Sequence, residues 1–365
     1  MRTNRLKVAY VPAVQGNPYL EILASHLAEH GVEVSYGNLS WILGRFDPAL
    51  ADVDVVHIHW LGALLGDPRR VHLTAKLIRF GLSLAWLRLG GKKIVWTVHN
   101  LYAHERAHMA FDRYLRRWVG RCANVVLTHC ENARRQVAED YGKGWARKIA
   151  VVPHGHFIDV YPNDVSKTEA REKLGIDEDV LLFLFFGQIR DYKGIPELID
   201  AFDRLGGGAS LIIAGMPRDR EIGSRLTDRV GSRHDVRLRL GFIPHDEIQL
   251  FMNACDAVVF PYRDVLTSGG TILAMSFGRA CVAPRMGCIE ELVDARGAFL
   301  YDTLDDQGLY KAMQRAVDAR EKLVHMGQHN RTEIERLSWP AIAKKTAELY
   351  RQCLYPGGSR RTKTR

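Results

Sequence analysis

Short apolar runs alternate with longer helical patterns along almost the whole chain. In the first half these runs are nearly continuous stretches of aliphatic residues, which is typical of parallel strands covered by helices on both faces. They predict strands at 7–11, 53–58, 93–98, 124–128 and 149–152. The segment 18–30 predicts the first helix, which ends at Gly31. This alternation predicts βαβ units and an α/β fold.

A second series of the same kind begins after a polar stretch at 163–170. Its apolar runs predict strands at 180–186, 210–214, 236–240, 257–260 and 280–283. A chain of 365 residues is too long for one ordinary core, so two domains are expected, at 1–165 and 166–336. A last helix within 337–356, opened by Trp339 and Pro340, is expected to pack back on the first domain. The basic tail at 357–365 is expected to be disordered.

Composition narrows the class of protein. Hydrophobic residues make up 47% and charged residues 25%, which is the balance of a globular rather than a disordered chain. The six cysteines form no CxxC pair, which argues against a disulfide framework or a zinc ribbon and favours a reducing compartment. The first residues lack the apolar core of a signal peptide, and no apolar run approaches the length of a membrane span. The sequence therefore predicts a cytoplasmic protein without a transmembrane anchor.

The net charge of +9, from 51 Lys and Arg against 42 Asp and Glu, indicates an anionic partner. Acidic lipid, a phosphorylated substrate and nucleic acid all qualify. We set nucleic acid aside, because the cations are not interleaved with aromatic residues in a recognised nucleic-acid module.

Part of this positive charge lies on predicted helices at 69–93 and 113–121. Arg69, His72, Lys76 and Arg79 fall three or four residues apart, so they share one helical face, while leucines occupy another. Two interpretations remain open at this point. The helices could lie on an anionic membrane surface, or they could pack on the core with a solvated basic side.

Two loops at predicted strand ends are suited to an anion. The first, 187–194, has glycines at both ends and carries Arg190 and Lys193. The second, 261–271, places Thr-Ser-Gly-Gly-Thr at the start of a helix, where free N–H groups and hydroxyls can donate. Each alone could be a solvated loop or an ordinary helix cap. Two such loops at neighbouring strand ends fit a diphosphate, because ligands of parallel sheets bind beyond the carboxyl ends of the strands.

The sequence predicts no metal site. His57 and His59 share one face of a strand, but no third zinc ligand is evident, so core or cleft histidines are favoured. The segment from Asp52 to Asp54 matches a DxD metal motif in form, yet it precedes a strand instead of following one at the ligand edge.

Several segments, taken in their order, resemble nucleotide-sugar-dependent glycosyltransferases. They are GQIRDYKGIPELIDAF, GFIPHDEIQLFMNACDAVVFPYRD and TSGGTILAMSFGRACVAPRMGCIEELV in the second half, and NPYL, VVHIHWL, WTVHNLYAHE and VPHGHF in the first. The resemblance is to glycosyltransferase family 4 broadly, and more closely to xanthan-type bacterial β-mannosyltransferases that use GDP-mannose. It implies the GT-B fold, in which two Rossmann-like parallel-sheet domains face a cleft.

The resemblance also implies a donor site in the second domain. Lys193 matches a family lysine, and Gln188 stands where the family has an arginine, so Arg190 is expected to supply the second cation. The other implied donor residues are Gly215, Phe242, Ile243, Tyr262, Thr267, Ser268, Gly269, Gly270, Thr271 and Glu291. Val265 and Leu273 occupy the positions of two family glutamates, which favours inversion over retention.

In the first domain the resemblance implies the acceptor side. An inverting transferase needs a base for the acceptor hydroxyl proton, and His99 and Glu105 are the candidates, with His104 behind them. A structural role stays open, in which His99 caps backbone groups and Glu105 pairs with Arg106. The remaining residues expected at the acceptor or the cleft are Asn17, Tyr19, Trp60, Asn100, His154 and His156.

The sequence therefore predicts a transferase that moves a hexose from a nucleotide diphosphate sugar to a saccharide, free or linked to polyprenyl diphosphate. The specific expectation is GDP-mannose with inversion to a β-mannoside, in polysaccharide or glycolipid biosynthesis at the inner face of the plasma membrane. No metal or other cofactor is expected, because cations and helix dipoles can neutralise the leaving diphosphate. The alternatives are a retaining family 4 transferase that uses a UDP-sugar, a GT-B nucleotide-sugar epimerase, and a non-catalytic nucleotide-sugar or nucleic-acid-binding protein.

Overall fold

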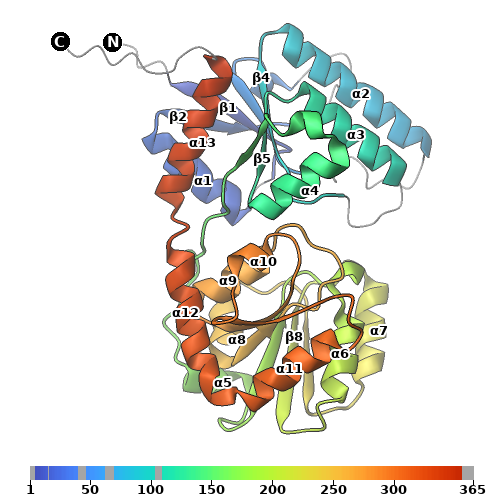
Figure 1. The fold of residues 1–365 in the computed structure, drawn as a ribbon, viewed down its shortest axis with the longest axis vertical. Helices are drawn as coiled ribbons and strands as arrows, with labels where there is room; N and C mark the ends of the chain where they lie inside the picture. Colours follow the sequence, from blue (N-terminus) through green and yellow to red (C-terminus); the bar gives the residue numbers. More distant parts are fainter. Residues whose placement is uncertain (1–4, 15, 40–46, 62–69, 103–108, 356–365) are drawn as a thin grey trace, which may run out of the picture. The chain divides into compact units, whose positions relative to one another are not determined.

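The computed structural model describes residues 5–14, 16–39, 47–61, 70–102 and 109–355, which form two compact units (Figure 1). The first unit comprises Met1–Gly155 and Ser338–Arg365, and the second comprises His156–Leu337. The boundary expected after residue 165 falls instead after Gly155. The reason is that the following segment is bonded to the second unit: the backbone N–H groups of Asp164 and Val165 donate to Gln249 Oε1, at 2.9 and 3.1 Å. The expected tail at 357–365 lies outside the described residues.

The first unit is built on a six-stranded parallel sheet with the order β2-β1-β3-β4-β5-β6. Its strands are β1 (Leu6–Val11), β2 (Val32–Tyr36), β3 (Val55–Ile58), β4 (Lys93–Thr97), β5 (Val125–Thr128) and β6 (Ile149–Val151). Its helices are α1 (Pro18–Glu29), α2 (Arg70–Leu89), α3 (Met109–Cys122), α4 (Glu131–Tyr141) and α13 (Trp339–Leu354), with short 3₁₀ turns η1 (Pro48–Leu50) and η3 (Lys143–Trp145). Figure 1 shows α13 beside α1, and the buried side chains of both helices share one core.

The second unit is also a six-stranded parallel sheet, with the order β12-β11-β10-β7-β8-β9. Its strands are β7 (Leu181–Phe186), β8 (Ala209–Gly215), β9 (Val236–Leu240), β10 (Ala257–Val259), β11 (Ala280–Pro284) and β12 (Ala298–Tyr301). Its helices are α5 (Lys167–Leu174), α6 (Ile195–Asp203), α7 (Arg220–Val230), α8 (Ile248–Ala254), α9 (Gly269–Ser276), α10 (Ile289–Leu292), α11 (Gly308–Asp318) and α12 (Leu323–Glu335), with 3₁₀ turns η4 (Asp191–Lys193) and η5 (Arg320–Lys322). The continuous apolar runs of its central strands are buried in one core.

All ten predicted strands are present, and β2 and β12 are additional. Both additional strands lie at an edge of their sheet. The edge position explains why the pattern missed β2: most of its side chains are partly exposed, so its sequence VEVSY lacks the continuous apolar run of a central strand. None of the described helices is long and apolar enough to cross a membrane.

Each sheet has one place where the direction of strand order reverses. In the first unit it lies between β1 and β3, and in the second it lies between β7 and β10. Parallel α/β sheets bind ligands in the crevice at such a point, beyond the carboxyl ends of the two strands. The fold therefore assigns each unit one preferred ligand position.

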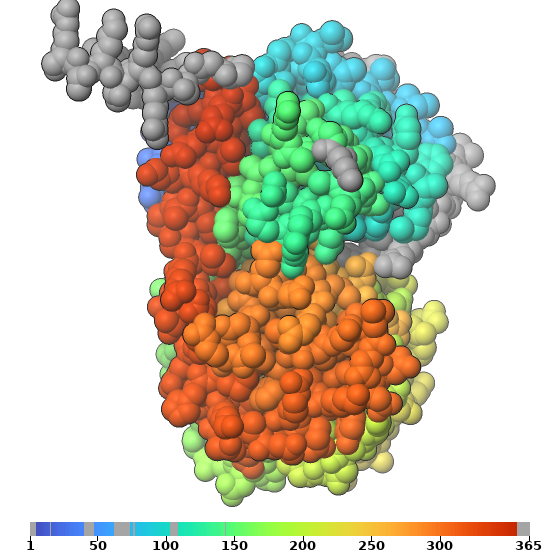
Figure 2. Space-filling view, in the orientation of Figure 1, coloured from blue at the N-terminus to red at the C-terminus, as the bar shows by residue number. Residues whose placement is uncertain are grey.

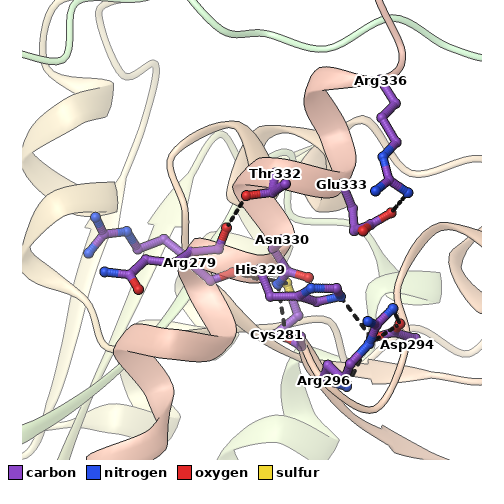
Figure 3. Close-up of polar contacts among 11 residues, drawn as sticks. Arg279, Cys281, Asp294, Arg296, His329, Asn330, Thr332, Glu333 and Arg336 are labelled. Carbon is purple, nitrogen blue, oxygen red and sulfur yellow. Dashed lines mark hydrogen bonds and ion pairs between the residues drawn. The ribbon is translucent and has the colours of Figure 1, made fainter.

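A buried side-chain amide on α12 connects two loops at the amino edge of the second sheet. The Asn330 side chain donates to the carbonyl oxygens of Arg279 at 2.9 Å and Gly297 at 2.8 Å (Figure 3). These residues stand at the amino ends of β11 and β12. Nearby on the same helix, His329 contacts Asp294 at 3.1 Å, while Thr332 is exposed.

Replacing Asn330 by alanine should lower the free energy of unfolding of the second unit by about 2–4 kcal/mol, since two carbonyls lose their donor in the interior. Thr332→Ala, on the same helix, is the matched control and should change it by less than about 0.5 kcal/mol. Urea denaturation followed by far-UV circular dichroism measures both. Equal losses in the two variants would contradict the assignment of Asn330 as the joining residue.

Candidate active site

The two anion-suited loops of the second unit meet at the reversal point between β7 and β10. Gly194 ends the first loop with a left-handed φ of 66°, and a Cβ there would lie 1.9 Å from the carbonyl oxygen of Pro261 in the second. The N–H of Arg263 donates to the Tyr192 carbonyl at 2.9 Å. Only glycine fits position 194, and this close approach fixes the spacing of the loops.

Lys193 brings a positive charge to this meeting point. Its Nζ donates to the Tyr262 hydroxyl at 3.2 Å and lies 4.6 Å from the centre of the Tyr262 ring. Burial lowers the pKa of Lys193 from its ordinary value. Within the described part of the chain Lys193 forms no ion pair. A partly buried ammonium without a carboxylate partner is suited to an anionic ligand.

The helix α9 points its N-terminus at the same place. Ser268 caps the helix, because its Oγ accepts from the N–H and the hydroxyl of Thr271 at 3.1 and 3.0 Å. The Thr271 hydroxyl is therefore engaged in the cap and buried, whereas we expected it to face the donor. A Cβ at Gly270 would lie 3.2 Å from the Tyr262 hydroxyl, so the first turn of the helix approaches Lys193. Its N–H groups add the positive end of a dipole.

Arg190 and Gln188 lie together at the edge of the loop. Arg190 Nε donates to Gln188 Oε1 at 3.1 Å. Gln188 is exposed and Arg190 is partly buried. The side chain of Gln188 therefore positions the neighbouring guanidinium of Arg190.

A surface cavity of about 570 Å³ lies at the ends of β8 and β9. Met216, Pro217, Leu240 and Gly241 line its strand side, and α7 lines the other side. Next to it the Phe242 side chain is 69% exposed. The volume is in the range of small-ligand sites, and exposed flat apolar side chains suit a nucleobase.

The other donor residues that the resemblance implies range from buried to exposed. Gly215 is required by packing, because a Cβ there would lie 1.8 Å from the Gly187 carbonyl oxygen. Ile243 is buried in the core, and Thr267 is partly buried, with its hydroxyl 3.7 Å from Cys288 Sγ. Glu291 is exposed on α10, which follows β11 rather than β7 or β10.

In the first unit, four adjacent strands each deliver a histidine to the carboxyl edge of the sheet. His59 follows β3, His99 follows β4, His129 follows β5 and His154 follows β6. We call these four residues the histidine row. Tyr19, near the start of α1, packs against all four rings, with centroid distances from 4.6 to 6.0 Å.

Three members of the histidine row form a hydrogen-bonded chain with one direction. His129 Nδ1 donates to the Val152 carbonyl at 2.9 Å, so His129 Nε2 must accept from His99 Nδ1, which lies 3.3 Å away. His99 Nε2 in turn accepts from His59 Nδ1 at 3.2 Å. This assignment requires neutral rings. Both nitrogens of His99 are engaged, and His59 Nε2 is buried without a partner among the described residues.

Burial keeps these imidazoles uncharged. It lowers the pKa of His129 to about 4, and burial together with the neighbouring His129 lowers the pKa of His154 to about 3. Burial also holds the pKa of His59 and His99 well below the ordinary value. His57, beneath the row, has its pKa lowered to about 3 by burial and bonds to the Tyr350 and Thr97 hydroxyls at 2.6 and 2.7 Å.

The remaining acceptor-side residues are separated by the structure. Asn17 caps α1, its Oδ1 accepting from the N–H groups of Tyr19 and Leu20. His154 belongs to the first unit and His156 belongs to the second. His104 and Glu105 lie outside the described residues.

The two aspartates that match a DxD metal motif in form both bind Lys7. Asp52 and Asp54 bind the side chain and the backbone N–H of Lys7, at the amino edge of the sheet. No group of three metal-binding side chains occurs in the described ranges.

His129 was not selected from the sequence as a site residue, although its position one residue after a predicted strand was a usable signal.

The neutral histidines predict acid instability of the first unit. Since the unfolded chain binds protons near pH 6.5 and the buried rings do so only near pH 4 or below, stability is complete above pH 6.5. It should fall between pH 6.5 and 4 by about 1.4 kcal/mol per pH unit for each ring. All seven tryptophans belong to the first unit, so urea denaturation followed by their fluorescence at pH 7.5, 6 and 5 isolates it. Equal stability at the three values would refute burial of the row.

The chain is similar to known proteins in its second half and over most of its length. Residues 166–333 match the family model described as glycosyl transferases group 1. The chain is 26% identical to GDP-mannose:glycolipid 4-beta-D-mannosyltransferase of Xanthomonas campestris over 95% of its own length and 91% of that protein.

Solved structures share the fold at low identity. Sucrose-phosphate synthase of Thermosynechococcus elongatus has a TM-score of 0.77 at 18% identity, covering 97% of this chain and all of that one. HepE of Anabaena, in complex with UDP-glucose, has a TM-score of 0.72 at 17% identity, covering 95% of this chain and all of that one. Residues 166–333 belong to the group 1 glycosyltransferases, and the chain has the GT-B fold of enzymes that transfer a sugar from a nucleotide sugar.

Proposed function

We propose that this glycosyltransferase moves mannose from GDP-mannose, with inversion, to a saccharide carried by a lipid. The name of the Xanthomonas relative supports both the donor and the glycolipid acceptor. Buried Val265 and Leu273 support inversion, because they stand where the retaining pattern has two glutamates.

One observation carries the donor side of the proposal. Lys193 sits at the reversal point between β7 and β10, with the Tyr262 hydroxyl and the N-terminus of α9 beside it. A diphosphate there would receive one full positive charge, several N–H donors and a hydroxyl without any metal. Those groups would stabilise the charge that develops on the leaving nucleotide.

The base for the acceptor hydroxyl is then Glu105 rather than His99. Both ring nitrogens of His99 are occupied by other histidines, so no lone pair is available for a substrate proton. Glu105 follows the same strand and carries a carboxylate of the kind used in general base catalysis.

The charge of the chain is divided unevenly between the units. The first unit contains 28 Lys and Arg against 13 Asp and Glu, a net charge of +15, and the second contains 23 against 29, a net charge of −6. The positive excess that the sequence revealed therefore belongs to the unit assigned to the acceptor. An acidic surface is the partner that this distribution favours.

The helices α2 and α3 supply a surface of matching chemistry. Figure 2 shows their side chains, in the blue to green part of the colour scale, at the surface of the first unit. Exposed apolar side chains there are Ile78, Leu82, Leu89, Met109, Phe111 and Tyr114, with the cations Arg79, Arg88, Arg113 and Arg121 among them. Arg116 does not contribute, because it is buried and pairs with Asp112 at 2.6 Å. We propose that this α2–α3 surface lies on an anionic membrane that carries the acceptor.

Donor specificity is tested by offering GDP-, UDP- and dTDP-sugars with lipid-linked saccharide acceptors. We expect GDP-mannose to be used and nuclear magnetic resonance of the product to give the β-anomer, with turnover retained in excess EDTA. An α-linked product, preference for a UDP-sugar, or activity restored only by Mg²⁺ would each contradict the corresponding part of the proposal.

Lys193→Ala should weaken binding of GDP-mannose about 10- to 100-fold, because a charge-assisted hydrogen bond to the diphosphate is lost. Lys173→Ala is the matched control: Lys173 is an exposed lysine of the same unit, paired with Glu169 on α5, and its loss should leave binding unchanged. Isothermal titration calorimetry measures both. Equal affinity in wild type and Lys193→Ala would exclude the loop as the diphosphate site.

Membrane docking is tested with the triple variant Ile78→Ser, Leu82→Ser, Leu89→Ser. It should lose most of its sedimentation with vesicles containing anionic phosphatidylglycerol, since three exposed apolar contacts are removed. Leu304→Ser is the control, because Leu304 is 89% exposed but lies in the second unit. Undiminished sedimentation of the triple variant would rule the α2–α3 surface out as the docking surface.

A further inference from the structure

Trp60 lies at the reversal point of the first sheet, directly after β3 and the histidine His59. Its indole is stacked on the His99 ring, with centroids 4.6 Å apart and planes only 17° from parallel. Its side chain is neither buried nor fully exposed. One face of the indole therefore contacts an imidazole, and the residue as a whole is partly exposed.

We propose that the face of Trp60 turned away from His99 is the platform on which a pyranose ring of the acceptor saccharide packs. The identity of this saccharide as the acceptor rests on the proposed function, whereas its packing on Trp60 rests on the geometry of the indole. The C–H groups on one face of a pyranose are weakly positive and apolar, which complements the negative face of an aromatic ring. Saccharide hydroxyls at the ring edge need polar partners, and the partly exposed amides of Asn17 and Asn100 follow the neighbouring strands β1 and β4.

The histidine row holds this platform in place. His99, on which Trp60 stacks, is fixed at both ring nitrogens by His59 and His129. His129 in turn donates a hydrogen bond to the carbonyl of Val152, the residue that follows β6. His99 and His129 are thus positioning residues, because they act on the acceptor only through the orientation of Trp60.

The primary test is steady-state kinetics of Trp60→Ala and Trp60→Phe with GDP-mannose and a lipid-linked acceptor. We expect Trp60→Ala to raise the acceptor KM at least tenfold with the donor KM unchanged, and Trp60→Phe to raise it less, since an aromatic face remains. Trp118→Ala is the matched control, because Trp118 is a partly exposed tryptophan of the same unit that packs on Gly81 of α2. An unchanged acceptor KM in Trp60→Ala overturns the proposal.

The positioning role needs a readout that a loss of stability alone would not produce. His129→Leu should raise the acceptor KM while leaving kcat at saturating acceptor unchanged, and His129→Gln, which retains an acceptor for His99 Nδ1–H, should recover most of the loss. Nitrogen-15 spectra should show His59, His99 and His129 as neutral rings protonated at Nδ1. A parallel loss in kcat for both variants, or Nε2-protonated rings, contradicts the positioning role.

A direct binding experiment separates this inference from the proposed function. Saturation-transfer spectra are recorded with cellotriose and mannotriose and no donor. Transfer to the C–H protons in wild type and Trp118→Ala, lost in Trp60→Ala, supports the platform even where GDP-mannose proves not to be the donor. Equal transfer in all three proteins, or binding of neither trisaccharide to wild type, overturns the platform whatever the donor.

Discussion

Parallel pairing of all the described strands is the constraint on which the candidate chemistry depends. Because every strand of a sheet runs the same way, residues far apart in sequence are delivered to one edge, and helices must return the chain to the other. Lys193 follows β7 and Tyr262 follows β10, yet their polar atoms are 3.2 Å apart. The same rule aligns four histidines that are spread over 96 residues, from His59 to His154. No local motif could create either cluster.

The two carboxyl edges solve the problem of buried polar groups in opposite ways. In the second unit Lys193 forms no ion pair among the described residues, and such a cation is suited to an anionic ligand. In the first unit burial removes the charge from the histidines, and neutral rings satisfy one another in a chain that ends on a carbonyl. A charged ligand suits the first arrangement, and a neutral polyhydroxyl ligand suits the second. This contrast matches a phosphorylated donor and a saccharide acceptor.

Sequence patterns predicted the central strands and the two anion-suited loops because both depend on local signals. Continuous apolar runs mark buried strands, and glycines with cations mark Lys193 and its loop. Edge strand β2 was missed because partial exposure breaks its apolar run, whereas β12, with the mostly buried run AFLY, was missed although it carries the signal of a strand. The one-way hydrogen-bonded chain of histidines was beyond the sequence, since it requires the ring positions on three strands. The engaged hydroxyl of Thr271 was equally beyond it, because a helix cap and a ligand donor have the same sequence signature.

The net charge of +9 does not show which unit carries the positive charge, whereas the separate values for the two units distinguish donor binding from attraction to an acidic surface. The unit that holds the candidate diphosphate site has a net charge of −6, so an anionic nucleotide must bind against the mean charge of that unit. It can do so because Lys193 and the N-terminus of α9 act within a few ångströms, whereas charges farther away are screened over about 8–10 Å. The net charge of +15 on the other unit is then not required for the donor. Its most direct physical consequence is attraction to an extended acidic surface, where many weak contacts add together and where the apolar side chains of α2 and α3 can be buried.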